Sequence, residues 1–152
     1  YLGYYQIRTI SRYLNITQKK SIENIIDDVV QERMTIDALK SDELFIKIED
    51  LVETEKLYLN FDVSIHELGE RLEMNSKYLS QAINSQDNLN FNRFINAKRI
   101  SYASLLIQDE QYNNYSLEGI AKESGFRSKS TFNTTFKEIM GCTPSEYKKR
   151  RQ

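Results

Sequence analysis

A group of polar side chains stands at helical spacing opposite two apolar residues in the middle of the sequence. Leu79 and Ile83 lie four positions apart and are expected to face a core, which leaves the opposite face polar. That outward face carries Ser76, Lys77, Ser80, Gln81 and Asn84. A lysine can reach O6 or N7 of guanine, and a glutamine can form two hydrogen bonds with adenine. This residue set therefore has the chemistry that reads base edges in duplex DNA.

A second group repeats this arrangement near the C-terminal end. We expect Phe132, Phe136 and Ile139 to face inward, because they recur at three- and four-residue spacing. The outward residues are then Lys129, Ser130, Asn133 and Thr134. Asn133 can pair with adenine.

Other residues near these two groups suit the phosphate backbone. Lys129 and Lys137 can neutralise phosphates as point charges without base preference. Asn75 and Ser128 precede the two helices, where backbone N–H groups and the helix dipole can hold a phosphate. Arg127 lies in the turn and is a further candidate for a backbone contact.

Residues that could support enzymatic chemistry are sparse. His66 is the single histidine, and neither a cysteine nor a second histidine stands near it for a metal site. Cys142 is the single cysteine, has no general base spaced to serve it, and is expected to be a half-buried thiol. We therefore predict no enzymatic activity, no cofactor and no metal.

Capping residues and helix breakers predict the elements that position these groups. Ser64 with Glu67 forms a capping box, and Thr143, Pro144 and Glu146 form another helix start. Gly125 and Gly141 suit the ends of helices. The expected helices cover residues 65–72, 76–85, 91–108, 117–124, 129–140 and 144–151. No alternating strand pattern is present, so the predicted fold class is all-α.

The preceding region contains two apolar stripes. Residues 21–34 place Ile22, Ile25, Ile26, Val29 and Val30 on one face. Residues 41–59 do the same with Leu44, Phe45, Ile48, Leu51, Val52 and Leu57, after Ser41 as the expected N-cap. A connector, a dimer interface and a packing layer against the following helices are all compatible with these stripes.

An internal repeat relates the two polar groups. Leu68 and Gly69 in the first unit correspond to Ile120 and Ala121 in the second, and the second turn is one residue longer. In both units a small residue lets two helices cross closely, and a short turn holds the second helix out with one face in solvent. A major groove about 12 Å wide admits one such helix. We therefore predict two helix-turn-helix units joined by a long linker helix and preceded by a helical connector.

Residues 56–150 resemble the DNA-binding domain of AraC/XylS-type transcription regulators. The resemblance is strongest over residues 120–149, where an Ile-Ala pair, a Gly-Phe turn, two phenylalanines four apart before a lysine, and then Gly, Pro and Tyr stand at the family's spacing. These residues are Ile120, Ala121, Gly125, Phe126, Phe132, Phe136, Lys137, Gly141, Pro144 and Tyr147. The first unit matches through Leu68, Leu79, Arg99, Ala103 and Leu106. Glu73 departs from the pattern, since the family often has glycine there.

The resemblance implies a function and a set of partners. It places base-facing positions at Lys77, Ser80 and Gln81, and implies a bacterial regulator that binds operator DNA and RNA polymerase. Activation is the expected action, and the residues themselves do not distinguish it from repression. Residues 1–55 are too short for the family's usual sugar-binding barrel. Such modules also follow membrane-bound or two-component sensors, and we expect an upstream sensor domain that this chain lacks.

Charge is unevenly distributed along the chain. Residues 1–55 carry 7 Lys and Arg against 11 Asp and Glu, whereas residues 121–152 carry 8 against 3. The basic C-terminal end favours a polyanionic partner. The C-terminal residues 148–151 are expected to contribute general electrostatic attraction or to form a solvated tail.

The expected organisation is a connector over residues 1–55, with a homodimer interface within residues 21–57, and the DNA-binding domain over residues 56–152. We expect a cytoplasmic protein, tethered to the inner membrane if the tyrosine-rich residues 1–10 lie beside a bilayer. The competing interpretation is a helical protein-interaction module in which DNA binding is weak or lost. A DNA-binding domain should bind duplex DNA with an affinity that falls steeply as salt rises.

Overall fold

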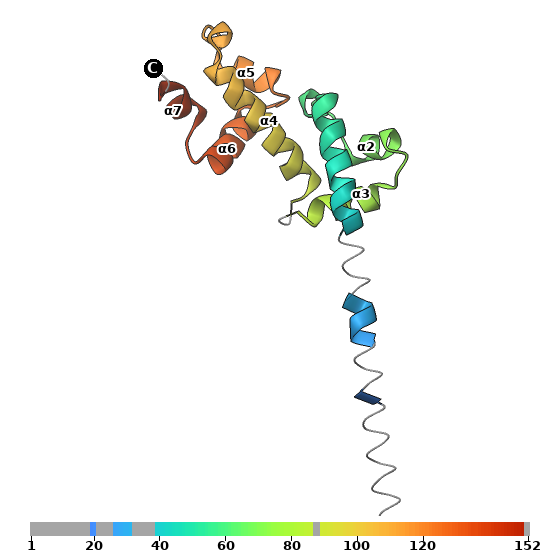
Figure 1. The fold of residues 1–152 in the computed structure, drawn as a ribbon. Coiled ribbons are helices and arrows are strands. Elements are labelled where there is room, and N and C mark those ends of the chain that lie inside the picture. Colours follow the sequence, from blue (N-terminus) through green and yellow to red (C-terminus); the bar gives the residue numbers. More distant parts are fainter. Residues whose placement is uncertain (1–18, 21–25, 32–38, 87–88, 151–152) are drawn as a thin grey trace, which may run out of the picture. The chain divides into compact units, whose positions relative to one another are not determined.

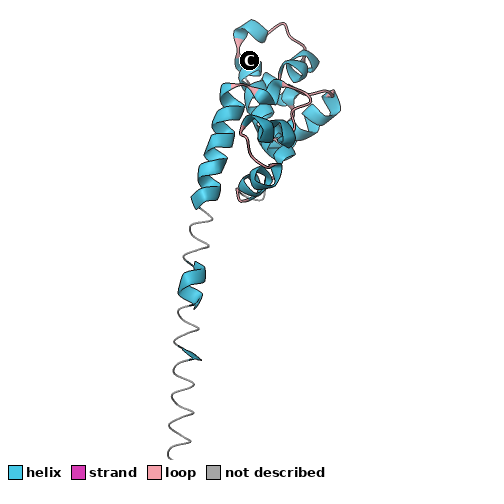
Figure 2. Cartoon of the chain, turned by 90° about the vertical axis from the view of Figure 1, so that its right-hand side faces the viewer, coloured by secondary structure: helices cyan, strands magenta, loops and turns pink. Residues whose placement is uncertain are grey.

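The structure is a computed structural model that describes residues 19–20, 26–31, 39–86 and 89–150. The chain divides into two compact units, Tyr1–Lys40 and Ser41–Gln152, and each is considered by itself. Every regular element within the described residues is a helix, as Figure 2 shows. The all-α prediction is therefore confirmed for this part of the chain.

The unit Ser41–Gln152 begins with a helix that runs to residue 54. Its later elements follow in chain order in Figure 1: η1 (Leu57–Leu59), α2 (Ile65–Arg71), α3 (Ser76–Asn84), α4 (Phe91–Gln108), η2 (Glu110–Tyr112), α5 (Leu117–Glu123), α6 (Lys129–Met140) and α7 (Pro144–Lys149). The short pairs α2–α3 and α5–α6 are the two predicted helix-turn-helix units, and α4 joins them.

Side-chain caps begin the helices where the sequence predicted. The Ser64 hydroxyl accepts a hydrogen bond from the Glu67 N–H, and the Asn75 side-chain oxygen Oδ1 accepts one from the Lys77 N–H. Asn90, Ser116, Ser128 and Thr143 cap their helices in the same way. The predicted ends were slightly long, because α2, α3, α5 and α7 stop at Arg71, Asn84, Glu123 and Lys149.

The prediction for residues 41–59 was wrong at both ends of the helix. Ser41 is not the N-cap, because residues 39–40 are already helical, and its hydroxyl instead lies 2.9 Å from that of Ser85. The helix stops at residue 54, and Lys56 adopts a left-handed conformation with φ 50°. Leu57 therefore begins the short 3-10 helix η1.

The apolar stripe of residues 41–57 is a packing layer. Ile48 and Val52 are fully buried, and the ring of Phe45 packs edge-on against Phe94 of α4 at 5.6 Å. The Lys98 ammonium also lies 2.6 Å from Glu49 and 2.9 Å from Glu53. Burial acts to lower the pKa of Lys98, but the hydrogen bonds to these carboxylates outweigh it and raise the pKa. These contacts place residues 41–55 with the helices that follow, so the compact unit begins before residue 56.

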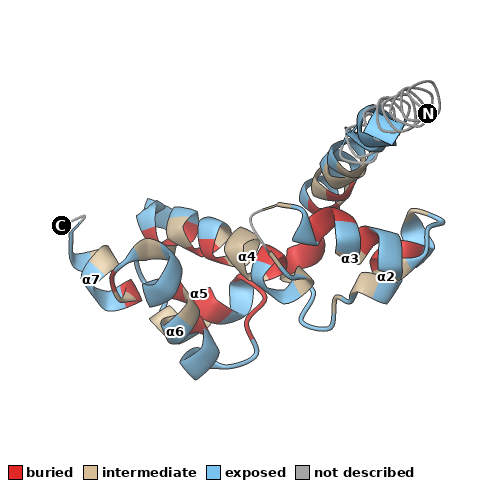
Figure 3. Cartoon of the chain, turned by 90° about the horizontal axis from the view of Figure 1, so that it is seen from below, coloured by how far each residue is buried: buried red, intermediate tan, exposed pale blue. Residues whose placement is uncertain are grey.

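Two hydrophobic cores lie on either side of the middle of α4. The first gathers the helix over residues 41–54 with η1, α2, α3 and the start of α4, and the second gathers the end of α4 with α5 and α6. Figure 3 shows the buried residues on the facing sides of these helices and the exposed ones on their outer sides. Each helix-turn-helix unit therefore has its own core, and α4 spans both.

The two turns share one backbone geometry. The Met74 N–H donates to the Gly69 carbonyl at 2.8 Å, and the Phe126 N–H donates to the Ala121 carbonyl at 2.9 Å. The residue before each donor has positive φ, 53° at Glu73 and 82° at Gly125. Asn75 then caps α3 directly, whereas Arg127 intervenes before the second cap. The extra residue of the second turn is thus placed after the shared hydrogen bond.

Gly69 is required by the turn rather than by the crossing of two helices. A Cβ at this position would lie 2.7 Å from the Met74 carbonyl oxygen and 3.3 Å from the Ser76 hydroxyl. The prediction that a small residue was needed here is correct, but the group it makes room for is the backbone of the following turn.

Replacing Glu73 with glycine is expected to stabilise the protein. A non-glycine residue in the left-handed region costs roughly 1–2 kcal/mol, and glycine returns part of this through the greater entropy of its unfolded chain. We expect a net gain of about 1 kcal/mol in the free energy of unfolding. Urea denaturation of both proteins measures it, and an unchanged midpoint would show that Glu73 is unstrained.

The unit Tyr1–Lys40 is described only in part. Residues 26–31 are helical, and Ile26, Val29 and Val30 leave about half of their surface exposed. Ile22, Ile25 and the tyrosine-rich residues 1–10 lie outside the described residues. A search of the described helices found none with the length and apolar character needed to span a bilayer.

Candidate nucleic-acid interface

The outward face of α3 is as the sequence predicted. Leu79 and Ile83 are fully buried, so the helix is fixed to its core by that side. Lys77, Gln81 and Asn84 are exposed, whereas Ser76 and Ser80 are half-buried at the edges of the face. The three exposed side chains thus form the centre of a polar surface that a groove could meet.

The outward face of α6 is similar, with one correction. Phe132 and Phe136 are fully buried, but Ile139 is 47% exposed and does not belong to the core. It lies in the last turn of the helix, where the neighbouring Met140, and not Ile139, packs against the second core. Ser128, Lys129, Ser130, Thr134 and Lys137 are exposed, and Asn133 is half-buried.

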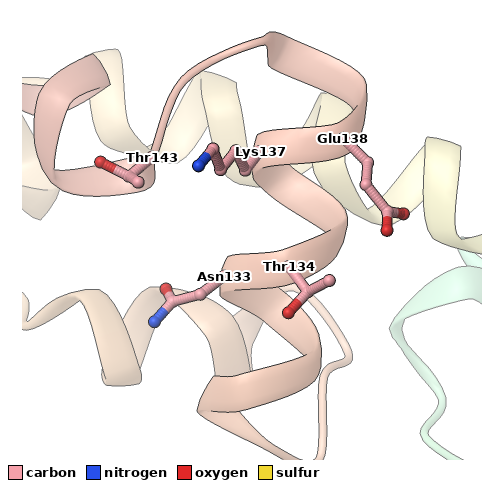
Figure 4. Close-up of a pocket in the computed structure, with 5 residues that line it drawn as sticks. All are labelled: Asn133, Thr134, Lys137, Glu138 and Thr143. Atoms are coloured by element: carbon pink, nitrogen blue, oxygen red, sulfur yellow. The ribbon is translucent and has the colours of Figure 1, made fainter.

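A shallow hollow of about 480 Å³ lies along the second half of α6. It is lined by Asn133, Thr134, Lys137, Glu138 and Thr143, as Figure 4 shows. In that view the Lys137 ammonium extends towards Thr143, while Glu138 points to the other side of the helix. The hollow therefore offers a cation and hydroxyl groups on one side and a carboxylate on the other.

The turn of the second unit carries an ion pair. The Arg127 guanidinium contacts the carboxylate of Asp62, which lies in the loop before α2. Both side chains are largely exposed, so the pair contributes little to stability. Arg127 was predicted to contact the DNA backbone, and a phosphate could replace Asp62 as its partner.

The basic C-terminal end has a structural role in part. The Lys148 ammonium donates to the backbone carbonyls of Asn113 and Tyr115, each at 3.2 Å. Lys148 therefore fastens α7 to the loop before α5 and is not simply a solvated cation. Lys149 and Arg150 are exposed, and Arg151 lies outside the described residues.

His66 is exposed as the sequence predicted, whereas Cys142, predicted to be half-buried, is only 4% exposed. His66 is on the exposed side of α2 with its Nε2 atom 3.5 Å from Glu70. The Cys142 thiol is buried between α6 and α7. No group of histidine, cysteine and acidic residues that could hold a metal was found in the described part of the chain.

Sequence reasoning missed the exposed Tyr78 and the contact that Arg99 makes. Tyr78 on α3 is 60% exposed beside Lys77, and its hydroxyl and ring are available to a ligand. The burial of Leu79 and Ile83 would have placed it at the flank of the outward face. Arg99 of α4 hydrogen-bonds the backbone between the two units. No local pattern reveals that contact, because its partners lie about 40 residues away.

The two halves of the compact unit differ in charge. Residues 41–90 carry 4 Lys and Arg against 11 Asp and Glu, whereas residues 91–150 carry 10 against 6. On α3 Lys77 is the one basic residue, whereas α6 and its preceding turn carry Arg127, Lys129 and Lys137. The second helix-turn-helix unit is therefore the one whose positive electrostatic field attracts a polyanion.

Comparison with known proteins gives a consistent assignment. The sequence profile of a family described as "Helix-turn-helix domain" matches residues 68–150. An uncharacterized HTH-type transcriptional regulator of Staphylococcus aureus (strain COL) is 30% identical over 102 residues, which are 67% of this chain and 13% of that protein. The melibiose operon regulatory protein of Escherichia coli (strain K12) is 30% identical over 95 residues, 61% of this chain and 30% of that protein.

A solved structure has the same fold. The C-terminal domain of the two-component response regulator yesN from Fusobacterium nucleatum superposes with a TM-score of 0.54 and 28% identity, covering 69% of this chain and 94% of that one. The chain thus spans a small part of the curated relatives that it matches, and nearly all of this solved domain.

Proposed function

Since the chain belongs to the AraC/XylS-type family of helix-turn-helix DNA-binding domains, whose members are non-enzymatic transcription regulators, we propose that it binds operator DNA sequence-specifically through α3 and α6 together. One observation carries the proposal. Each unit buries the apolar side of its second helix and exposes a face rich in lysine, amide and hydroxyl groups. Because α4 contacts both second helices, a single chain presents both faces.

The pair of helices suits successive major grooves. Helix-turn-helix dimers place their reading helices about 34 Å apart, one turn of duplex. Here one chain carries both reading helices, so α3 and α6 would enter two neighbouring grooves on the same face of the DNA. Lys77, Ser80 and Gln81 would read one half-site, and Ser130, Asn133 and Thr134 the other. Ser76, Asn84 and the caps Asn75 and Ser128 would lie at the edges of these contacts.

The charge distribution supports unequal roles for the two units. The second unit, with Arg127, Lys129 and Lys137, would supply most of the phosphate contacts and hence most of the non-specific affinity. The first unit, surrounded by acidic residues, would add base contacts more than electrostatic attraction. Binding of generic duplex at low salt tests the proposal. A helical protein-interaction module, the alternative, would bind no duplex at about 50 mM salt.

Changing Gln81 to alanine is expected to relax specificity. An amide that pairs with adenine through two hydrogen bonds contributes about 1–3 kcal/mol of discrimination at one base pair. Discrimination at that base pair should fall, while the dependence of affinity on salt stays unchanged because no charge is removed. Competition binding with single-base variants of a selected site measures both quantities. Equal weakening on every duplex would instead assign Gln81 to the DNA backbone.

The exposed apolar stripe of the unit Tyr1–Lys40 supports a homodimer. Ile26, Val29 and Val30 lie on one face of a described helix and are about half exposed. A second copy of the same stripe would cover them. Sedimentation equilibrium should give a dimer mass, and Val29→Asp should give a monomer while Asp28→Asn, off the stripe, does not. A concentration-independent monomer mass for the unmodified chain contradicts the dimer.

The wider role of the protein follows from the same assignment. We propose a cytoplasmic activator that contacts RNA polymerase and is the output end of a longer sensor, tethered to the inner membrane in the full-length protein. The chain spans 13% and 30% of the two curated relatives, which supports a longer full-length protein. Transcription in vitro from a template with the selected site should rise when the protein is added. A fall would identify a repressor.

A further inference from the structure

Three segments that are far apart in the sequence meet between the two helix-turn-helix units. The Arg99 side chain of α4 donates from Nε to the Tyr58 carbonyl at 2.7 Å and from Nη2 to the Asn60 carbonyl at 2.9 Å. Its guanidinium also lies 5.7 Å from the centre of the Phe126 ring, in the turn between α5 and α6. We call this contact of Tyr58, Asn60, Arg99, Gly125 and Phe126 the inter-unit joint.

The joint is closely packed on the side of the second unit. A Cβ on Gly125 would lie 2.4 Å from the Tyr58 carbonyl oxygen and 3.1 Å from the Leu59 Cα. The backbone of η1 therefore touches the turn of the second unit directly. Because Phe126 packs edge-on against Phe132 at 5.3 Å, a shift at the joint would be transmitted to α6.

The chemistry of the joint requires an arginine. The planar guanidinium donates to two carbonyls through separate nitrogens while its central carbon lies over the Phe126 ring, 5.7 Å from the ring centre. A lysine would supply one ammonium and could not hold both carbonyls in this geometry while keeping its charge over the ring. These bonds give the Tyr58 carbonyl a donor and add a second donor to the Asn60 carbonyl, which also accepts from the Val63 N–H at 3.4 Å.

The joint connects two cores that otherwise share only α4, and the exposed Arg127–Asp62 pair lies beside this contact as a further link between the two helix-turn-helix units. Tyr58 belongs to the first core and Phe126 to the second. With α4 alone, each unit could rock about the linker helix. The added contact gives the two units a second point of attachment, and this fixes the separation and the mutual rotation of α3 and α6.

We propose that Arg99 is a positioning residue that sets the spacing between the two DNA half-sites without touching DNA. The inference rests on the proposed function, because half-site spacing has meaning only if both helices bind. It goes beyond that function by naming the residue that determines which operator geometry fits. The structural part of the inference, that Arg99 fixes the separation of α3 and α6, can be tested without DNA.

The first experiment measures that separation. Spin labels are placed at Asn84→Cys on α3 and Glu138→Cys on α6 in a Cys142→Ser background, and double electron–electron resonance gives their distance distribution. The protein with Arg99 intact should give one narrow distance distribution. Arg99→Ala should widen that distribution about twofold, which is well beyond the spread of a label within one staggered rotamer. Arg99→Lys should lie between. Ile120→Val, a buried control of similar modest destabilisation, should stay narrow.

The second experiment measures spacing preference. Duplexes carry a site selected by the unmodified protein, with the half-sites moved one base pair nearer or farther. The unmodified protein and Ile120→Val should each lose about tenfold in affinity on the shifted sites. Arg99→Ala should bind all three within about threefold.

The outcomes separate the two claims. A narrow distance distribution for Arg99→Ala overturns the positioning role, whatever happens with DNA. An unmodified spacing preference in Arg99→Ala overturns it as well. A widened distribution together with no duplex binding by any protein would support the joint as a mechanical contact and contradict the proposed function.

Discussion

Replacing Gly125 with alanine is expected to lower the free energy of unfolding by about 3 kcal/mol, the largest effect of an alanine at any glycine that the structure describes. Gly125 has φ 82°, a conformation in which a side chain costs roughly 1–2 kcal/mol. The added methyl would also lie 2.4 Å from the Tyr58 carbonyl oxygen, which is backbone and cannot rotate away. Overpacking of this kind costs about 1–3 kcal/mol more.

Gly141 provides the matched control. It also has positive φ, 72°, but a Cβ there would have no neighbour within 4 Å. Gly141→Ala should therefore lose only the conformational part, about 1 kcal/mol. Guanidinium denaturation of the three proteins gives both values, provided that the dependence on denaturant is unchanged. Equal losses in the two variants would show that the contact with η1 is absent in solution.

Removing the two lysines of α6 is expected to have the largest effect on DNA binding. Lys129 and Lys137 are exposed on α6, which belongs to the more basic half of the domain. Each phosphate contact that is lost lowers the slope of log affinity against log salt by about 0.9. The double variant Lys129→Ala, Lys137→Ala should therefore lose almost two units of slope and weaken binding on all sequences alike, by about a hundredfold at low salt.

Lys122→Ala is the control for each lysine removed, because it makes the same change of charge as either single substitution. Lys122 is on α5, is 63% exposed and pairs with Glu118 at 3.4 Å. Lys122 lies outside the proposed interface, and salt screens the attraction between a distant charge and the DNA. Its removal should therefore leave the slope of log affinity against log salt within about 0.3 of the unmodified value. Fluorescence anisotropy titrations from about 50 to 200 mM salt cover the useful range. A similar loss of slope in all variants would point to net charge alone.

The local elements were predictable because their signals are local. Ser64, Asn75 and Ser128 cap helices that begin at the next residue, and side-chain to backbone hydrogen bonds over two or three positions determine such starts. The burial of Leu79, Phe132 and Phe136 likewise follows from helical periodicity. Glu73 was recognised as a departure from the family pattern, which often has glycine there. Its positive φ gives the physical reason for that glycine.

The errors concern tertiary contacts. Ile139 follows the periodicity of a buried residue, but the sequence does not show that Met140 takes the core position in the last turn of α6. Ser41 has the chemistry of a cap, yet the helix continues through it. The packing of residues 41–54 on α4 depends on pairs such as Glu49 with Lys98, which are separated by 49 positions. No single-sequence pattern specifies such pairs.

The candidate site divides in the same way. The exposed polar residues of α3 and α6 could be named from helical geometry, because an inward face determines an outward one. The joint at Arg99 and the pairing of Arg127 with Asp62 could not, since both join segments that only the folded chain brings together. These contacts govern how two similar units are oriented, and orientation is what a duplex with two half-sites would recognise.

Hydroxyl-radical footprinting on a selected duplex tests the central claim most directly. A domain that inserts both α3 and α6 should protect two segments on one face of the DNA, centred about 10 base pairs apart. Gln81→Ala should weaken one protected segment, and Asn133→Ala the other. A single protected segment, or protection that both substitutions weaken equally, would contradict the account in which the two units read successive grooves.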